Sequence, residues 1–173
     1  MKLIKSIKPI FLVAFVFSFL TFACKSDDDG GNGGLASSGT ITAKVNGNSL
    51  TTLNLVTSAN LVSGNLMIQG NTGGTNAKSI TLLIMGVNGT GTYPIGGGAN
   101  INNSASYIEL SGTITNPQTT TWQAPYDSNQ VGEIKISEMT ATQVKGTFNY
   151  KAKNTTGDQS IKEITEGSFN LSL

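Results

Sequence analysis

The fold class follows from one stretch of the chain, Thr142-Gln143-Val144-Lys145-Gly146-Thr147-Phe148-Asn149-Tyr150-Lys151-Ala152-Lys153. Small and apolar residues alternate along it with lysine, threonine and asparagine. A period of two is that of a β-strand, in which successive side chains point to opposite faces. The stretch therefore predicts a strand with one buried face and one solvated face, which is typical of antiparallel sheets.

The same alternation recurs on both sides of this stretch. It predicts further strands over residues 41–45, 65–69, 79–85, 105–112, 132–138 and 162–173, and Asn46-Gly47 predicts a tight turn after the first. Residues 79–85 are apolar on both faces, which predicts a central or partly covered strand. Ile164 is out of phase with Phe169 and Leu171, so we expect a β-bulge near Glu166-Gly167.

The remaining segments are less regular. Residues 50–57 are expected to form a second strand, and Pro94 predicts an edge strand or the end of a strand because proline cannot donate to a ladder. Residues 113–128 are expected to be irregular, with a short strand near residues 120–123. The whole pattern predicts an all-β antiparallel meander of about 8–10 strands, either barrel-like or a β-sandwich, with short turns favouring the barrel-like form.

The first 24 residues predict an exported, lipid-anchored protein. Lys2, Lys5 and Lys8 precede a nearly continuous apolar run from Ile10 to Ala23, too short to cross a bilayer and suited to a signal peptide. Cys24 follows as the only cysteine. The segment resembles a bacterial lipobox, which implies that Cys24 becomes the lipidated first residue of the mature chain. We expect a cleaved signal over residues 1–23, a lipidated cysteine and flexible tether over 24–38, and a β domain over 39–173.

The residues after Cys24 indicate a cellular location. Lys25-Ser26-Asp27-Asp28-Asp29 resembles the acidic export tag of surface-displayed lipoproteins of the Bacteroidetes. This resemblance implies anchoring in the bacterial outer membrane through lipid on Cys24, with the domain facing the cell exterior. A periplasm-facing location is the alternative.

Composition argues against several classes of function. The chain has no histidine and no arginine, and its only cysteine is assigned to lipid. Histidine is the commonest general base and metal ligand, and basic side chains supply most contacts to phosphate. We therefore expect no catalytic residues, no metal site, no cofactor and no nucleic-acid partner.

Four aromatic residues are the candidate ligand contacts: Trp122, Tyr126, Tyr93 and Tyr107. Aromatic rings near asparagine, glutamine and aspartate side chains can stack on a sugar, and the partner that this hypothesis implies is an extracellular glycan or small molecule. The favoured interpretation is structural: Trp122 closes one end of a barrel with its ring N–H hydrogen-bonded, and Tyr93 and Tyr107 are interpreted in the same way. The favoured interpretation is a non-catalytic surface module, and the alternative is a carrier of a small apolar ligand inside a barrel. The carrier would need a cavity that Phe148, Phe169, Ile134, Ile136, Leu82 and Ile84 do not fill.

Five short motifs follow one another along the chain: residues 89–96 (GTGTYPIG), 105–107 (ASY), 132–136 (GEIKI), 144–150 (VKGTFNY) and 164–169 (ITEGSF). In this order they resemble an uncharacterised family of small Bacteroidetes lipoproteins with a domain of unknown function. The resemblance covers residues 39 to the C-terminus. It implies the same cellular address, and it implies no activity, substrate or catalytic residue.

Overall fold

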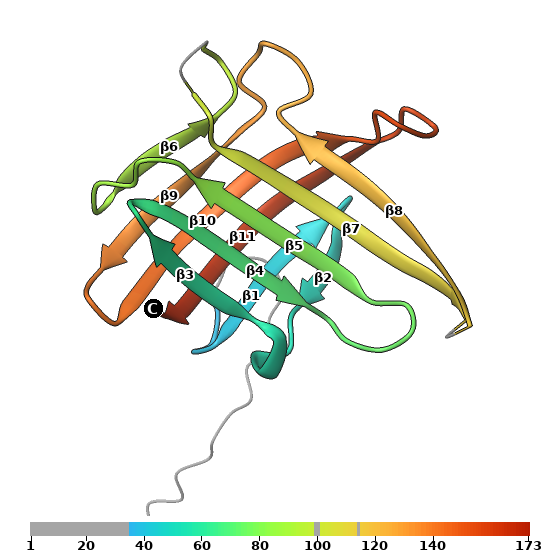
Figure 1. Cartoon of the computed structure of the whole chain (residues 1–173), viewed down its shortest axis with the longest axis horizontal. Helices are drawn as coiled ribbons and strands as arrows, with labels where there is room; N and C mark the ends of the chain where they lie inside the picture. Colours follow the sequence, from blue (N-terminus) through green and yellow to red (C-terminus); the bar gives the residue numbers. More distant parts are fainter. Residues whose placement is uncertain (1–34, 99–100, 114) are drawn as a thin grey trace, which may run out of the picture. The chain divides into compact units, whose positions relative to one another are not determined.

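A computed structural model describes residues 35–98, 101–113 and 115–173, and this part of the chain is all-β, as predicted (Figure 1). The predicted signal peptide, Cys24 and most of the predicted tether lie outside the described residues. Eleven strands are present: β1 (Thr40–Val45), β2 (Asn48–Thr51), β3 (Ser58–Val62), β4 (Asn65–Asn71), β5 (Lys78–Ile84), β6 (Gly91–Ile95), β7 (Ser104–Thr113), β8 (Asn116–Ala124), β9 (Gly132–Met139), β10 (Gln143–Lys153) and β11 (Ile161–Ser172). One 3₁₀ turn, η1 (Asn54–Val56), lies between β2 and β3.

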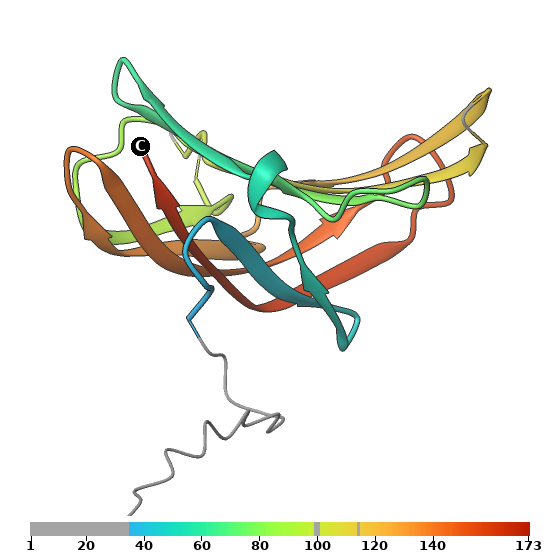
Figure 2. The ribbon, with the colours of Figure 1, turned by 90° about the horizontal axis from the view of Figure 1, so that it is seen from below.

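The strands of the β domain lie in two layers (Figure 2). The first layer has the order β8-β7-β5-β4-β3, and the second has the order β2-β1-β11-β10-β9-β6. Every pairing is antiparallel, and the layers are joined where Lys153 of β10 pairs with Gln123 of β8. The sheet is not closed into a barrel. Of the two predicted architectures, the layered one therefore describes the domain better.

Most neighbours in the sheet are neighbours in the sequence, as a meander requires, but four pairings depart from it: β1–β11, β5–β7, β6–β9 and β8–β10. β6 leaves the path between β5 and β7 and pairs with β9 in the second layer. β1, near the start of the domain, pairs with β11 at its end. Among the described strands β6 has β9 as its single partner, which confirms the edge position that Pro94 predicts.

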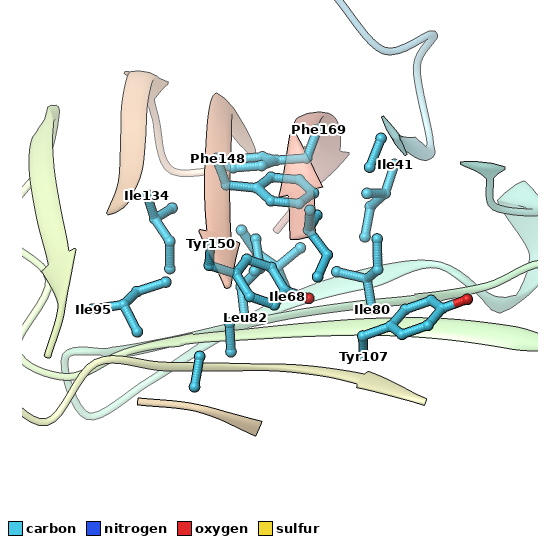
Figure 3. Close-up of a cluster of buried hydrophobic side chains, with 14 of the residues drawn as sticks. Ile41, Ile68, Ile80, Leu82, Ile95, Tyr107, Ile134, Phe148, Tyr150 and Phe169 are labelled. Atoms are coloured by element: carbon cyan, nitrogen blue, oxygen red, sulfur yellow. The ribbon is translucent and has the colours of Figure 1, made fainter. Parts of the chain in front are cut away.

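The core fills the space between the layers (Figure 3). Inward side chains of both layers are buried: Ile68, Ile80, Leu82, Ile84, Tyr107 and Trp122 from the first, and Ile41, Ile134, Ile136, Phe148, Tyr150 and Phe169 from the second. On β10 the inward set is the one that alternation predicts, Val144, Gly146, Phe148, Tyr150 and Ala152. Burial of these side chains is the main favourable term in folding the domain.

Two glycine–phenylalanine pairs join β10 to β11. Gly146 lies opposite Phe169, and Phe148 lies opposite Gly167. The two rings stack with their centroids 6.4 Å apart. A Cβ atom on Gly167 would lie 2.5 Å from the Phe148 ring, and one on Gly146 would lie 2.5 Å from the Phe169 ring. Each glycine thus makes room for the ring on the facing strand.

The predicted bulge is confirmed on β11. Phe148 pairs with Gly167, but Tyr150, two residues along β10, pairs with Ile164. The extra residue on β11 is accommodated at Glu166, whose φ of 50° is in the left-handed region. The bulge returns Ile164 to the core, which is why it is out of phase with Phe169 in the sequence.

Two predicted elements are wrong. Residues 50–57 are not one strand, because β2 ends at Thr51 and the chain turns inward at Thr52. The hydroxyl of Thr52 is buried and accepts hydrogen bonds from the Ile41 amide (2.9 Å) and the Thr57 hydroxyl (2.7 Å).

Residues 116–124 form a nine-residue strand, β8, in a segment expected to be largely irregular. Most of β8 extends beyond the core, so only Trp122 and Ala124 are buried and no alternation marks the strand. Its ladder with β7, from Ala105–Ala124 to Thr113–Asn116, holds it in place.

Candidate functional site

Four side chains from three strands form a compact cluster: Tyr107 and Glu109 on β7, Trp122 on β8 and Lys162 on β11. Tyr107 and Trp122 are cross-strand partners, and their ring centroids lie 5.7 Å apart. The Lys162 Nζ atom lies 4.6 Å from the centroid of the Trp122 ring and 3.0 Å from Glu109 Oε1. The Tyr107 hydroxyl donates to the same carboxylate oxygen at 2.8 Å. The cluster is therefore both an ion pair and a cation–π contact.

The surroundings change the proton affinities in this cluster. Burial would raise the pKa of Glu109, but the hydrogen bonds from Lys162 and Tyr107 and the positive charges nearby outweigh it, so that pKa is lowered. Burial raises the pKa of Tyr107, and its hydrogen bond to the Glu109 carboxylate raises it further. Glu109 therefore stays ionised and Tyr107 stays protonated near neutral pH, which is the state of a structural ion pair.

Trp122 is held from the other side by a turn. Its Nε1 atom donates to the Ser160 hydroxyl at 2.9 Å, and that hydroxyl donates to Asp158 Oδ1 at 2.7 Å. The hydrogen bonds from the Ser160 hydroxyl and amide lower the pKa of Asp158. Only 4% of the Trp122 surface is exposed. The two aromatic residues that the structure brings together, Tyr107 and Trp122, thus make their polar contacts inside the domain.

The other two aromatic candidates lie elsewhere. Tyr93 is half-buried on β6, and its hydroxyl donates to the Gly89 carbonyl at 2.8 Å while it accepts from the Asn88 amide at 3.1 Å. Tyr126 is half-buried in the segment after β8, just beyond the cis peptide bond between Ala124 and Pro125. The four candidates do not form one site, and the prediction that they contact a ligand stays a prediction.

A different surface gathers groups that could meet a ligand. We call the outward side chains of β3, β4, β5, β7 and β8 the neutral face. From Asn46 to Tyr126 the only charged residues are Lys78 and Glu109. They pair with each other on β5 and β7, and each is in phase with the inward side chains of its strand. The neutral face therefore carries hydroxyl, amide and apolar groups. The first layer bows so that this face is concave (Figure 2).

Two hollows lie side by side on the neutral face and share Thr81. One, of about 340 Å³, is lined by Thr81, Leu83, Ser104, Ala105, Ser106, Gln123, Ala124 and Pro125. The other, of about 320 Å³, is lined by Val56, Gln69, Gly70, Asn71, Ser79, Thr81 and Ile108. Both sizes are in the range of small-ligand sites. Each hollow combines several hydroxyl or amide groups with a few apolar side chains.

The outward side of the second layer has the opposite character. It carries three ion pairs: Lys44 with Glu166 at 2.9 Å, Lys145 with Glu138 at 3.1 Å and Lys151 with Glu163 at 3.5 Å. These pairs are exposed and contribute little to stability, but they keep that surface strongly hydrated. The charge asymmetry singles out the neutral face as the surface suited to contact.

Sequence reasoning missed the hollows because their residues come from four strands between residues 56 and 125. The signal that could have pointed to them is the nearly uncharged segment from Asn46 to Tyr126. Lys162 was missed as well, because it is 53 residues from Glu109 and meets it only through the pairing of the two layers.

In the described ranges 35–98, 101–113 and 115–173, no group of three or more Cys, Asp or Glu side chains is placed to hold a metal ion. The same part of the chain contains no helix that is long and apolar enough to cross a membrane.

A family model described as a domain of unknown function, DUF6252, matches residues 37–171. The chain belongs to this family. The match covers β1 to β10 and all but the last residue of β11, so the two-layer fold and the neutral face both lie within it. Comparisons with curated proteins and with solved structures find no match. Membership therefore agrees with the family of unknown function that the motifs indicate, and it assigns no activity.

Proposed function

We propose that this protein is a lipoprotein of the bacterial outer membrane whose β domain is displayed at the cell exterior as a non-catalytic binding module. The observation that supports the address is Cys24, the only cysteine, which follows a lysine-bearing start and an apolar run. The likeness to small Bacteroidetes lipoproteins points the same way.

The neutral face supports binding as the activity. Its two adjoining hollows present Gln69, Ser79, Thr81, Ser104 and Gln123 without a charged group among their lining residues. Uncharged hydroxyl and amide groups suit a neutral extracellular glycan or another uncharged small molecule, whose hydroxyls they can match by hydrogen bonds. Charged ligands would lose hydration at this surface without gaining a partner.

A non-catalytic role is consistent with the same residues. The chain has no histidine, and the hollows contain no carboxylate, thiol or lysine. Glu109, the one mid-strand carboxylate beside an aromatic ring, is engaged by Lys162 and Tyr107. We therefore propose that the protein recognises its ligand and does not transform it.

The alternative of an apolar-ligand carrier has no observation in its favour. The six side chains on which it depends, Phe148, Phe169, Ile134, Ile136, Leu82 and Ile84, are each at most 3% exposed and pack in the core between the layers.

The anchor is tested by Cys24→Ser in the native host. We expect the protein to move from the membrane fraction to a soluble or unprocessed form, because lipid attachment needs the thiol. Ser26→Ala, two residues away, is the matched control and should remain with the membrane. Mass spectrometry of the natural protein should find a diacylglyceryl group on Cys24, and a free thiol there would contradict the proposal.

Display is tested by adding proteinase K to whole cells. The domain should be digested while a periplasmic marker stays intact, and protection of both would favour the periplasm-facing alternative. Changing Asp27, Asp28 and Asp29 together to Asn should preserve membrane attachment and reduce digestion, because the acidic tag is the proposed export signal.

Binding is tested by screening the purified, detergent-solubilised protein against arrays of neutral and anionic glycans. Thr81→Asp places a charge where the two hollows meet and should weaken binding of a neutral glycan at least tenfold. Thr147→Asp, an exposed position on the outward side of β10, is the matched control and should bind like the natural protein. Equal binding by both variants would remove the neutral face as the site.

A further inference from the structure

The loop between β2 and β3 exposes apolar side chains where a protein surface in water usually carries polar ones. Leu53, Leu55 and Val56, in and beside η1, have exposed fractions of 52%, 95% and 50%. A single exposed leucine is common on protein surfaces. Three such residues within four positions form a patch, and exposed apolar patches mark interaction surfaces. We call residues 53–57 the Leu55 loop.

Hydrogen bonds hold the Leu55 loop in its shape. The Val56 amide donates to the Leu53 carbonyl at 3.1 Å, and the Thr57 hydroxyl donates to the same carbonyl at 2.7 Å. The Thr57 amide donates to the Asn54 carbonyl at 3.2 Å. Pairing of these polar groups within the loop lowers the cost of moving it out of water. The segment from Asn46 to Ala77 contains no charged residue, so no charge would have to move with the loop.

The Leu55 loop lies beside the place where the chain enters the domain, at the lower end in Figure 1. The Asn54 side chain donates to the Ser38 carbonyl at 3.2 Å, and a Cβ atom on Gly39 would collide with the same side chain. Cys24 precedes Ser38 by fourteen positions, and an extended chain of that length spans at most about 50 Å. Lipid on Cys24 would therefore keep this end of the domain within that distance of a bilayer.

We propose that Leu53 and Leu55 insert into the surface of the membrane that holds the lipid of Cys24, so that the domain rests on the bilayer by its Leu55 loop. This inference rests on the proposed lipid anchor. Apolar side chains that bind in this way lie about 5–10 Å deep, at the boundary of headgroups and acyl chains.

A bilayer fits the Leu55 loop because it is the apolar phase that the anchor itself brings within reach. A few apolar side chains bind a membrane weakly by themselves, since binding strength scales with the buried apolar area. The anchor would make the contact intramolecular and so raise its effective concentration. A loop at the opposite end of the domain would gain less from the same anchor.

A polarity-sensitive dye on the loop tests the contact. The full-length Leu55→Cys variant is labelled with a nitrobenzoxadiazole iodoacetamide and reconstituted into phosphatidylcholine vesicles that contain lipid with a nitroxide on its acyl chain. Leu55 is almost fully exposed, so the change should leave the fold intact. We expect lipid to quench this dye at least threefold more strongly than a dye at a control position. The vesicles hold no other protein, so the quenching would report lipid.

Ile161→Cys is the matched control. Ile161 is also apolar and is 49% exposed, but it lies at the start of β11. The chain enters the domain near the other end of that strand, where Thr40 pairs with Asn170. A dye on Ile161→Cys should therefore stay in water and escape the nitroxide.

The natural chain separates failure of the anchor from failure of the loop contact. Its only cysteine is Cys24, and lipid on that thiol would leave the dye nothing to react with. Labelling of the natural chain would overturn the anchor and the loop contact with it. An unlabelled natural chain, together with equal quenching in Leu55→Cys and Ile161→Cys, would overturn the loop contact alone.

A second variant tests Leu55 without a dye at its own position. With the dye on Leu53→Cys, adding Leu55→Asp should reduce the quenching at least threefold, because a carboxylate resists leaving water. Adding Thr147→Asp instead, at an exposed position on β10, should leave the quenching unchanged. Unchanged near-ultraviolet circular dichroism would show that both double variants fold. Equal quenching in the two would contradict the insertion of Leu55.

Discussion

Gly167→Ala is the substitution whose effect the structure determines most sharply. The three atoms nearest to a Cβ at this position all belong to the Phe148 ring, at 2.5–2.6 Å. That ring is 3% exposed and stacks on Phe169, so moving it would disturb the packing of the core. Overpacking of this kind costs about 1–3 kcal/mol in the free energy of unfolding. For a domain of this size the melting temperature should fall by about 4 °C per kcal/mol.

The assay is urea unfolding followed by fluorescence of Trp122, the only tryptophan and a buried one. Gly98→Ala is the matched control, because its Cβ would lie at least 3.4 Å from any neighbour. We expect that variant to unfold within about 0.5 kcal/mol of the natural protein.

Phe148→Leu tells overpacking apart from any other effect of the added methyl group. Alone it should cost about 1–2 kcal/mol, because it leaves part of a ring-shaped space empty. Combined with Gly167→Ala it should cost at least about 1 kcal/mol less than the sum of the single changes, because the clashing ring is gone. Strictly additive costs, or a Gly167→Ala variant as stable as the natural protein, would refute the reasoning.

Three further predictions concern the hydrogen-bonded side chains. Burial raises the pKa of Tyr150, with a smaller effect of Tyr107, and burial and Glu109 raise the pKa of Tyr107, so each tyrosine should lower stability above pH 10 by about 1.4 kcal/mol per pH unit; Tyr150→Phe should remove its own share of that slope in alkaline unfolding titrations and leave the share of Tyr107. Because the pKa of Glu109 is lowered, its ionised carboxylate stabilises the folded state above about pH 5, and this stabilisation is lost on acidification. In Glu109→Gln the free energy of unfolding should therefore fall less steeply as the pH is lowered from about 5 to 3. Ser160→Ala should cost about 1 kcal/mol in urea unfolding and shift Trp122 emission, because the indole N–H loses its acceptor.

The charge asymmetry between the layers agrees with the proposed binding role of the neutral face. The second layer carries most of the lysines and carboxylates of the domain, and the first carries two. Protein contact surfaces are depleted of charge at their centres, whereas solvated surfaces are not. A ligand in the hollows would use the first layer and leave the charged layer in water.

The sequence by itself determined the class of fold, because a period of two is local and needs no knowledge of distant partners. The buried set on β10, the Asn46-Gly47 turn, the edge position of β6 and the bulge at Glu166 could all be predicted in this way. Strand β8 could not be, since its threonines and glutamine lie beyond the core and only the ladder with β7 orders them.

Only the tertiary structure decided which surfaces and contacts exist. Lys162 of β11 reaches Glu109 of β7 because the two layers face each other, and Thr81 lies between Gln69 and Ser106 because β5 pairs with both β4 and β7. β6 pairs with β9 in the second layer, and β3 ends the strand order of the first layer. Alternation states which side of a strand is buried. It carries no information on which strand lies beside it, and the hollows, the ion pair and the free edge all depend on that choice.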